Sequence, residues 1–178
     1  MFQQARTDHA AYFVVKGELK IGGTQSEFEP IFNLYGKCIE EETGEALDIA
    51  GSQGGYVYVD NYVPGSEYAP FSSQLNFLGF PVPYWYYVSG NGLIKEQVPS
   101  KRQVEGEIER YVEENLNNCD FESFYLQGYE INFEEPEVRV RIDENRVRVD
   151  VNSNVVVKGK SSGRKEIHNV EIDSKFGK

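Results

Sequence analysis

The sequence has few of the residues that carry catalysis, redox chemistry and metal binding. Its 178 residues include two histidines, two cysteines, one tryptophan and one methionine. The histidines, His9 and His168, belong to no Ser/His/Asp or Cys/His arrangement, and we expect both to face solvent. CxxC spacing is absent, so neither thioredoxin-like chemistry nor a cysteine zinc site finds support. The sequence therefore predicts a protein that is not an enzyme and that uses no metal and no cofactor.

Long apolar runs and a surplus of positive charge are also missing. No run of 18 apolar residues occurs, so the chain as given contains no predicted membrane span. Its first residues lack the basic and then apolar pattern of a secretory signal. The net charge is −11, from 29 acidic and 18 basic residues, and its repulsion of phosphate argues against nucleic acid as a partner. We expect contact with a membrane only through an anchor absent from this chain.

The chain does have sufficient length and many aromatic residues. A chain of 178 residues can bury about two-thirds of its unfolded surface, and we predict a single domain over residues 1–178 with a flexible lead-in over residues 1–10. Twelve tyrosines and eleven phenylalanines bring the aromatic fraction to 13%. This composition favours sheets and surfaces that bind other molecules.

Two segments have the periodicity of amphipathic helices. The first covers residues 24–51, with Ser26 as its N-cap and Gly51 as its end, and the second covers residues 101–119 after Ser100. Charged residues occupy the face of the second helix opposite its apolar stripe. The two stripes consist of Phe28, Ile31, Phe32, Tyr35, Ile39, Ala46, Leu47 and Ala50 in the first helix and Val104, Ile108, Tyr111, Val112 and Leu116 in the second.

Alternating residues predict strands before, between and after these helices. Strands are expected over residues 11–23 and 53–63, and an aromatic hairpin over residues 81–99. Because residues 60–99 contain five of the seven prolines, regular structure there should be short. EVRVRI and RVRVDV predict a hairpin around the turn 143–145, and another strand follows the SSG turn. The expected fold class is α+β, with a mainly antiparallel sheet and two amphipathic helices.

The two cysteines lie in the two predicted helical segments. If Cys38 and Cys119 are bonded, they close a loop of about 80 residues, which the chain-entropy model values at roughly 4 to 5 kcal/mol. A bond would link the two helices and indicate an oxidising compartment. The alternative is a pair of buried free thiols in a cytosolic protein. The state of the cysteines therefore bears on both compartment and architecture.

The densest aromatic run in the chain is a candidate interaction surface. It comprises Tyr84, Trp85, Tyr86 and Tyr87, and Tyr56 and Tyr58 lie upstream of it. Four consecutive aromatics on a strand cannot all face one side, so some must point away from the main core. Tyrosine and tryptophan are favoured at interfaces because they bury large areas with few rotors. We predict a surface for a protein partner or for copies of the chain itself. A second internal layer and a stacking platform for glycans or small ligands are the alternatives.

Paired carboxylates permit a third interpretation, that of a hydrolase. Adjacent acids occur at residues 40–42, 113–114 and 134–135, and two carboxylates can suffice for glycoside hydrolysis. However, a chain with 29 acidic residues contains such pairs by chance. No catalytic residue is therefore assigned.

Four motifs occur in a fixed order: CIEEETGEALDIAGSQGGYVYV, PYWYY, PSKRQVEGEIERYVEENLNNC and GYEINFEEPEVRVRIDENRVRVDVNSNVVV. Over roughly residues 35–157, the chain resembles a group of uncharacterised archaeal proteins in which one N-terminal membrane helix anchors an extracytoplasmic domain. The resemblance implies an envelope or cell-surface protein outside the cytoplasm, with Cys38 and Cys119 paired. It implies no catalytic residues. The chain departs from this pattern at its start, where the anchoring helix is absent.

Overall fold

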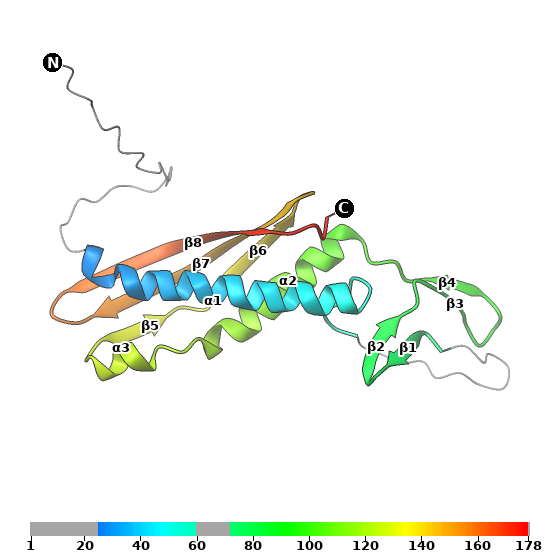
Figure 1. The fold of residues 1–178 in the computed structure, drawn as a ribbon, viewed down its shortest axis with the longest axis horizontal. Coiled ribbons are helices and arrows are strands. Elements are labelled where there is room, and N and C mark those ends of the chain that lie inside the picture. The colour runs from blue at the N-terminus through cyan, green and yellow to red at the C-terminus, as the bar shows by residue number, and fades with distance from the viewer. Residues whose placement is uncertain (1–24, 60–71, 178) are drawn as a thin grey trace, which may run out of the picture.

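The protein has an α+β fold in which helices pack with antiparallel strands, as the sequence predicts. The computed structural model describes residues 25–59 and 72–177 (Figure 1). The helices are α1 (Gln25–Ser52), α2 (Lys101–Asn115) and the short α3 (Glu122–Leu126), and a 3-10 turn, η1 (Leu116–Asn118), follows α2. The strands are β1 (Gln74–Phe77), β2 (Phe80–Pro83), β3 (Tyr86–Val88), β4 (Ile94–Glu96), β5 (Glu130–Phe133), β6 (Glu137–Ile142), β7 (Arg146–Lys158) and β8 (Ser162–Asp173).

The molecule is elongated and has two parts (Figure 1). We call α1, α2, η1, α3 and β5–β8 the body. Residues 72–99, which hold β1–β4, form the tip, at the end of the molecule where α1 ends. The body contains almost all of the buried apolar residues. The aromatic run therefore lies outside the main core.

The centre of the body's sheet is β7, a strand of 13 residues. Its first half pairs with β6 and its second half with β5, so these two short strands follow one another along the same edge of β7. β8 pairs with the opposite edge. Alternation buries every second residue from Val147 to Val157, as expected for a strand with one face against the core. The predicted hairpin around residues 143–145 and the strand after it are confirmed.

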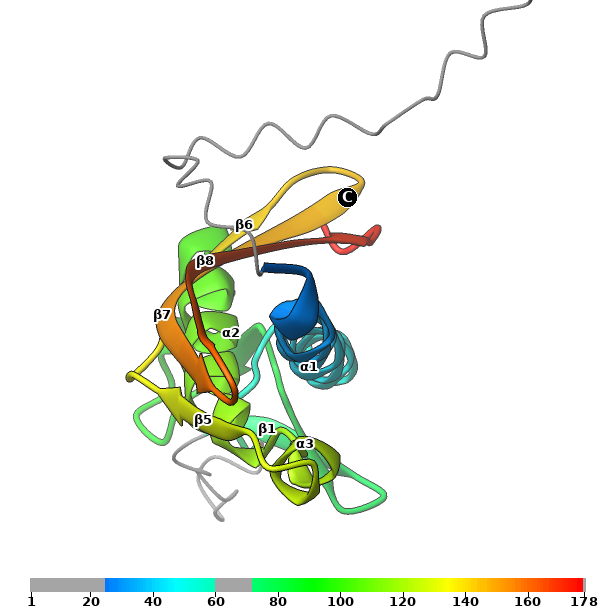
Figure 2. The same ribbon diagram turned by 90° about the vertical axis from the view of Figure 1, so that its left-hand side faces the viewer.

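α1 lies on one face of this sheet, which curves around it (Figure 2). Its predicted apolar stripe is buried from end to end. Near the start of α1, the Phe28 ring lies against Gly163 of β8, where an added Cβ would overlap the ring. Glycine is needed there because only a residue without a side chain lets helix and strand approach so closely.

α2 runs along the outer edge of β6 and closes that edge with carboxylates. Three alternate backbone N–H groups of β6 each donate to one glutamate of α2: Val138 to Glu113 at 2.9 Å, Val140 to Glu109 at 3.0 Å and Ile142 to Glu105 at 3.0 Å. Four helical residues rise about 6 Å and two strand residues about 6.7 Å, so the two spacings match. This glutamate ladder satisfies the donors that an edge strand would otherwise expose.

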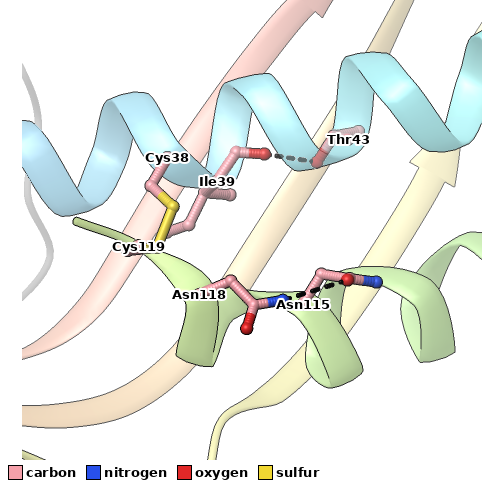
Figure 3. The surroundings of a disulfide bond; sticks show 6 residues. All are labelled: Cys38, Ile39, Thr43, Asn115, Asn118 and Cys119. Atoms are coloured by element: carbon pink, nitrogen blue, oxygen red, sulfur yellow. Dashed lines mark hydrogen bonds between the residues drawn. A yellow bond between two sulfur atoms is a disulfide. The ribbon is translucent and has the colours of Figure 1, made fainter.

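A disulfide connects the two helical segments of the body. Cys38 on α1 and Cys119, just after η1, are bonded, with their Cα atoms 6.0 Å apart and 81 positions between them in sequence (Figure 3). This Cα separation is normal for a disulfide. The sequence left open a disulfide and a pair of free thiols, and the structure contains the disulfide.

Some predicted boundaries are confirmed and others are wrong. Ser100 is the N-cap of α2 and forms a capping box with Gln103, as the position of Ser100 suggested. Ser26, however, already lies within α1, which begins at Gln25. Residues 56–59 form no strand, because their backbone turns instead toward α2, where the Val57 N–H donates to Glu107 at 2.6 Å. The expected strand over residues 11–23 and the lead-in over 1–10 lie outside the described residues.

The expectation that His168 faces solvent is wrong. His168 is 2% exposed on β8, opposite Val151, and its ring meets the Tyr35 ring edge-on at 4.7 Å between centroids. Burial, followed by the nearby Lys165 ammonium, lowers the pKa of His168 to about 4. The imidazole is therefore neutral at physiological pH and packs as part of the core. His9 lies outside the described residues.

Candidate interaction surface

Two hairpins build the tip. Leu78 and Gly79 join β1 to β2, both with positive φ, of 52° and 93°. β3 pairs with β4 from Tyr86 opposite Glu96 to Val88 opposite Ile94, which confirms an aromatic hairpin within the predicted range 81–99. The predicted start is wrong, because residues 81–83 belong to β2 and pair with β1. Each hairpin is a sheet of two strands, and within the described residues no third strand joins either one. Isolated two-stranded hairpins are only marginally stable in water, so both depend on contacts outside themselves.

Hydrogen bonds fix the base of the tip to the end of α1. The Trp85 indole Nε1–H donates to the Gly54 carbonyl oxygen at 2.8 Å. The Tyr56 hydroxyl donates to the Gln97 carbonyl oxygen, and the Gln97 side-chain amide donates to the Ser73 carbonyl oxygen at 2.7 Å. The two hairpins and the segment after α1 are thereby joined in one network. The tip therefore projects from the body in a defined direction.

Beyond this base, the tip exposes large apolar side chains. The most exposed are Leu78 at 84%, Ile94 at 77%, Tyr86 at 60%, Phe77 at 59% and Leu93 at 57%. Leu75, Tyr84, Trp85, Val88 and Val98 are exposed to a lesser degree. Single exposed apolar residues are ordinary, but a group of this size on one small region is typical of an interaction site.

The tip is also almost free of charge. Among residues 72–99, only Lys95 and Glu96 are charged, and their charges cancel. The whole net charge of −11 is therefore carried by residues outside the tip. An uncharged apolar end on an acidic molecule favours contacts that bury apolar surface over contacts made by charge.

The structure separates the predicted aromatic residues into two groups. Tyr84, Trp85 and Tyr86 are exposed on the tip, and Tyr87 is half-buried. Tyr56 lies at the base instead, and Tyr58 packs against α2 of the body. The Tyr58 ring faces the Arg110 guanidinium at 3.4 Å, and its hydroxyl donates to Glu114 at 2.7 Å. Burial first, and then the bond to Glu114, raise the pKa of Tyr58.

The aliphatic part of this surface was not predicted. Leu78, Leu93 and Ile94 flank the two hairpin turns and exceed Trp85, which is 51% exposed, in their exposed fractions. The sequence pattern that could have predicted these exposed residues is leucine or isoleucine beside the turn glycines Gly79 and Gly92. Apolar side chains next to a hairpin turn have no strand face to pack against.

Two hollows in the described surface lie on the body, and neither includes a residue of the tip. The larger, about 540 Å³, lies between α2 and the segment linking β5 to β6. Its lining includes two of the three predicted groups of adjacent acids, 113–114 and 134–135, and not the group at 40–42. Three of these acids already hold protein groups: Glu113 accepts from Val138 N–H, Glu114 from Tyr58, and Glu134 from Asn154 at 3.0 Å. These bonds give the three acids structural roles.

The remaining observations concern metals and membranes. Over residues 25–59 and 72–177, no three histidine, cysteine or carboxylate side chains gather as a metal site would require. Crossing a membrane would take a longer apolar stretch than any helix in these ranges provides.

Fold and surface together define an α+β domain with a disulfide-linked body and an exposed apolar tip without net charge. Comparison of the chain with models of known protein families, with curated proteins and with solved structures finds no match.

Proposed function

We propose that the chain is a non-enzymatic domain of an envelope or cell-surface protein, and that it acts by protein–protein contact through the tip. The observation that carries the proposal is the gathering of exposed apolar side chains on a region with no net charge. Such a surface is costly to leave in water, and burial against a protein would remove about 25 cal/mol of unfavourable free energy per Å².

The location outside the cytoplasm is part of the same proposal. The disulfide between Cys38 and Cys119 supports it, because structural disulfides are typical of oxidising compartments. The resemblance to archaeal proteins anchored by an N-terminal membrane helix points the same way, and we include that anchored arrangement in the proposal. Alkylation of intact cells before lysis, followed by intact-mass measurement with and without reductant, tests the compartment. Free thiols in the native protein would contradict it.

Crosslinking from the tip tests the contact itself. A photo-crosslinking amino acid replaces Leu93 at the tip, and in a matched control it replaces Leu126 on α3, which is 82% exposed at the opposite end of the molecule (Figure 1). In cells that produce the protein, we expect protein adducts from position 93 and few from position 126. No adduct at 93, or the same adducts from both positions, would count against a role for the tip.

A glycan or small-ligand platform is the alternative use of the same aromatic residues. Tyr86 supports it, because its exposed ring stands next to a polar partner, Glu96, with 3.4 Å between the Tyr86 hydroxyl and the carboxylate. Titration calorimetry with oligosaccharides would then show heat that disappears in Tyr86→Ala. Heat that is equal in the variant, or absent in both proteins, would exclude this use.

A further inference from the structure

We infer that the partner of the tip is a second copy of the same chain, bound tip to tip through the open edge of β4. This inference rests on the proposed function and names the partner that binds the tip. The two β4 strands pair antiparallel across a two-fold axis, and Ile94 of one copy lies opposite Ile94 of the other. Such an interface is self-complementary, as closed dimers require.

The hydrogen bonds of the tip identify which backbone groups are open. The Gln97 N–H donates to the Trp85 carbonyl oxygen, and the Leu93 carbonyl oxygen accepts from Ser89 N–H, both at 2.8 Å. Because backbone groups alternate along an antiparallel strand, Ile94 and Glu96 direct theirs to the opposite side. Within the described residues, β4 pairs only with β3. The outer edge of β4 can therefore accept another strand.

The edges of the body do not offer the same opportunity. The glutamate ladder occupies alternate N–H groups of β6. The long outer edge of β8 carries exposed charged side chains, including Lys165, Glu166 and Glu171, which oppose pairing with another strand. Unlike these edges of the body, the outer edge of β4 combines open backbone groups with neighbouring apolar side chains.

Charge selects one of the three registers that are centred within β4. In an antiparallel pair of β4 strands, a residue with outward backbone groups in one copy must lie opposite such a residue in the other copy. The two-fold axis can therefore pass through Ile94, Lys95 or Glu96. Centring the pair on Lys95 places two ammonium groups opposite each other, and centring it on Glu96 does the same with two carboxylates. Like charges directly opposite are destabilising. Centring it on Ile94 avoids both clashes and covers the most exposed strand side chain of the tip.

The distribution of charge over the whole chain favours the same arrangement. A tip-to-tip contact joins two surfaces without net charge and leaves the two acidic bodies pointing away from it (Figure 1). A body-to-body contact would bring acidic surfaces within a Debye length, about 8 Å at physiological ionic strength. The chain therefore associates with itself at the tip in preference to other regions.

Sedimentation velocity over a concentration series tests the dimer. We expect the wild type to dimerise and Ile94→Lys to weaken the dimer at least about tenfold, which corresponds to 1.4 kcal/mol. Leu126→Lys is the matched control, since it places the same charge on an equally exposed apolar position of the body. A monomeric wild type, or equal effects of the two substitutions, would overturn the inference. Circular dichroism confirms that each variant is folded.

Cysteine substitution tests the register. A disulfide between two copies requires the Cα atoms of the two cysteines to lie within about 7 Å of each other. Ile94→Cys should therefore crosslink two copies rapidly under mild oxidation, whereas Glu96→Cys should not. Equal crosslinking of both variants, or faster crosslinking of Glu96→Cys, would overturn the assigned pairing. Failure of this inference can also be distinguished from failure of the proposed function. Photo-adducts from position 93 to a different protein, with a monomeric purified chain, would refute self-pairing and leave contact through the tip intact.

Discussion

The body and the tip differ in whether the backbone groups of an edge strand have hydrogen-bond partners. In the body, β6 is an edge strand, but the glutamate ladder from α2 occupies its alternate N–H groups. In the tip, β4 is also an edge strand, and within the described residues nothing but β3 pairs with it. The body thus satisfies the edge of β6 with its own side chains, whereas the outer edge of β4 has no partner strand within the described residues.

The two regions also differ in what holds them together. The body buries a continuous apolar core and adds a disulfide across 81 positions of sequence. The tip has few buried residues and depends on hydrogen bonds to the end of α1, such as that from Trp85 to Gly54. We propose that the body supplies stability and the tip supplies contact.

The largest effect is expected from removal of the disulfide. Replacement of Cys38 and Cys119 with serine should lower the free energy of unfolding by about 4 kcal/mol, because the unfolded chain regains the entropy of a loop of about 80 residues. Urea denaturation measures the loss. Wild type unfolded in reductant is the control and should match the variant. A loss below about 1 kcal/mol would show that the body does not need this link.

The next largest effect comes from His168 and concerns pH. The folded pKa, about 4, lies below the unfolded value of 6.5, so between these pH values the unfolded chain binds a proton that the folded chain does not. Stability should therefore fall by about 3 kcal/mol as pH decreases from 6.5 to 4, and should gain nothing from this group above 6.5.

The matched variant for this prediction is His168→Leu, because carboxylates elsewhere also titrate in the same range. The difference in stability between wild type and variant should change with pH over that window and be constant above it. An identical pH dependence in both proteins would show that His168 is not a source of acid sensitivity. Association through the tip, which contains no histidine, should not follow the pH dependence of His168.

A smaller effect is expected from the glutamate ladder. Glu105→Ala leaves the Ile142 N–H without its acceptor, which should cost about 2 kcal/mol. Glu105→Gln keeps a carbonyl oxygen at the same place and should cost less. Equal losses in the two variants would mean that charge or packing matters more than the hydrogen bond. The alanine variant also makes the edge of β6 more like that of β4, so it should self-associate more than wild type.

The parts of the fold that local patterns determine could be predicted from the sequence. The β6–β7 hairpin follows from strict alternation, because a one-residue shift would move every valine to the wrong face. The start of α2 follows from Ser100 and its capping box. The α+β class follows from these elements together. For the cysteines, the sequence left two alternatives, a disulfide or two free thiols.

Features created by tertiary contacts were harder to predict. Glu105, Glu109 and Glu113 look like a solvated helix face, and only the neighbouring β6 turns them into a ladder. Pro81 and Pro83 argue against a strand, yet β2 contains both, because a strand with an unpaired side can lack some N–H donors. His168 was the avoidable error, since it alternates in phase with Val170 and Ile172 and so shares their inward face.

The smallest predicted effect concerns the attachment of the tip. Trp85→Phe keeps an aromatic ring but removes the Nε1–H bond to the Gly54 carbonyl oxygen, worth about 1 kcal/mol. Since this bond joins the tip to the body, hydrogen exchange should become faster over residues 72–99 and stay unchanged in β7. Tyr86→Phe is the control, because the Tyr86 hydroxyl has only a long contact of 3.4 Å with Glu96 within the tip itself. Faster exchange throughout the body of Trp85→Phe would show that the two regions unfold as one unit, and the separation of stability from contact would then be wrong.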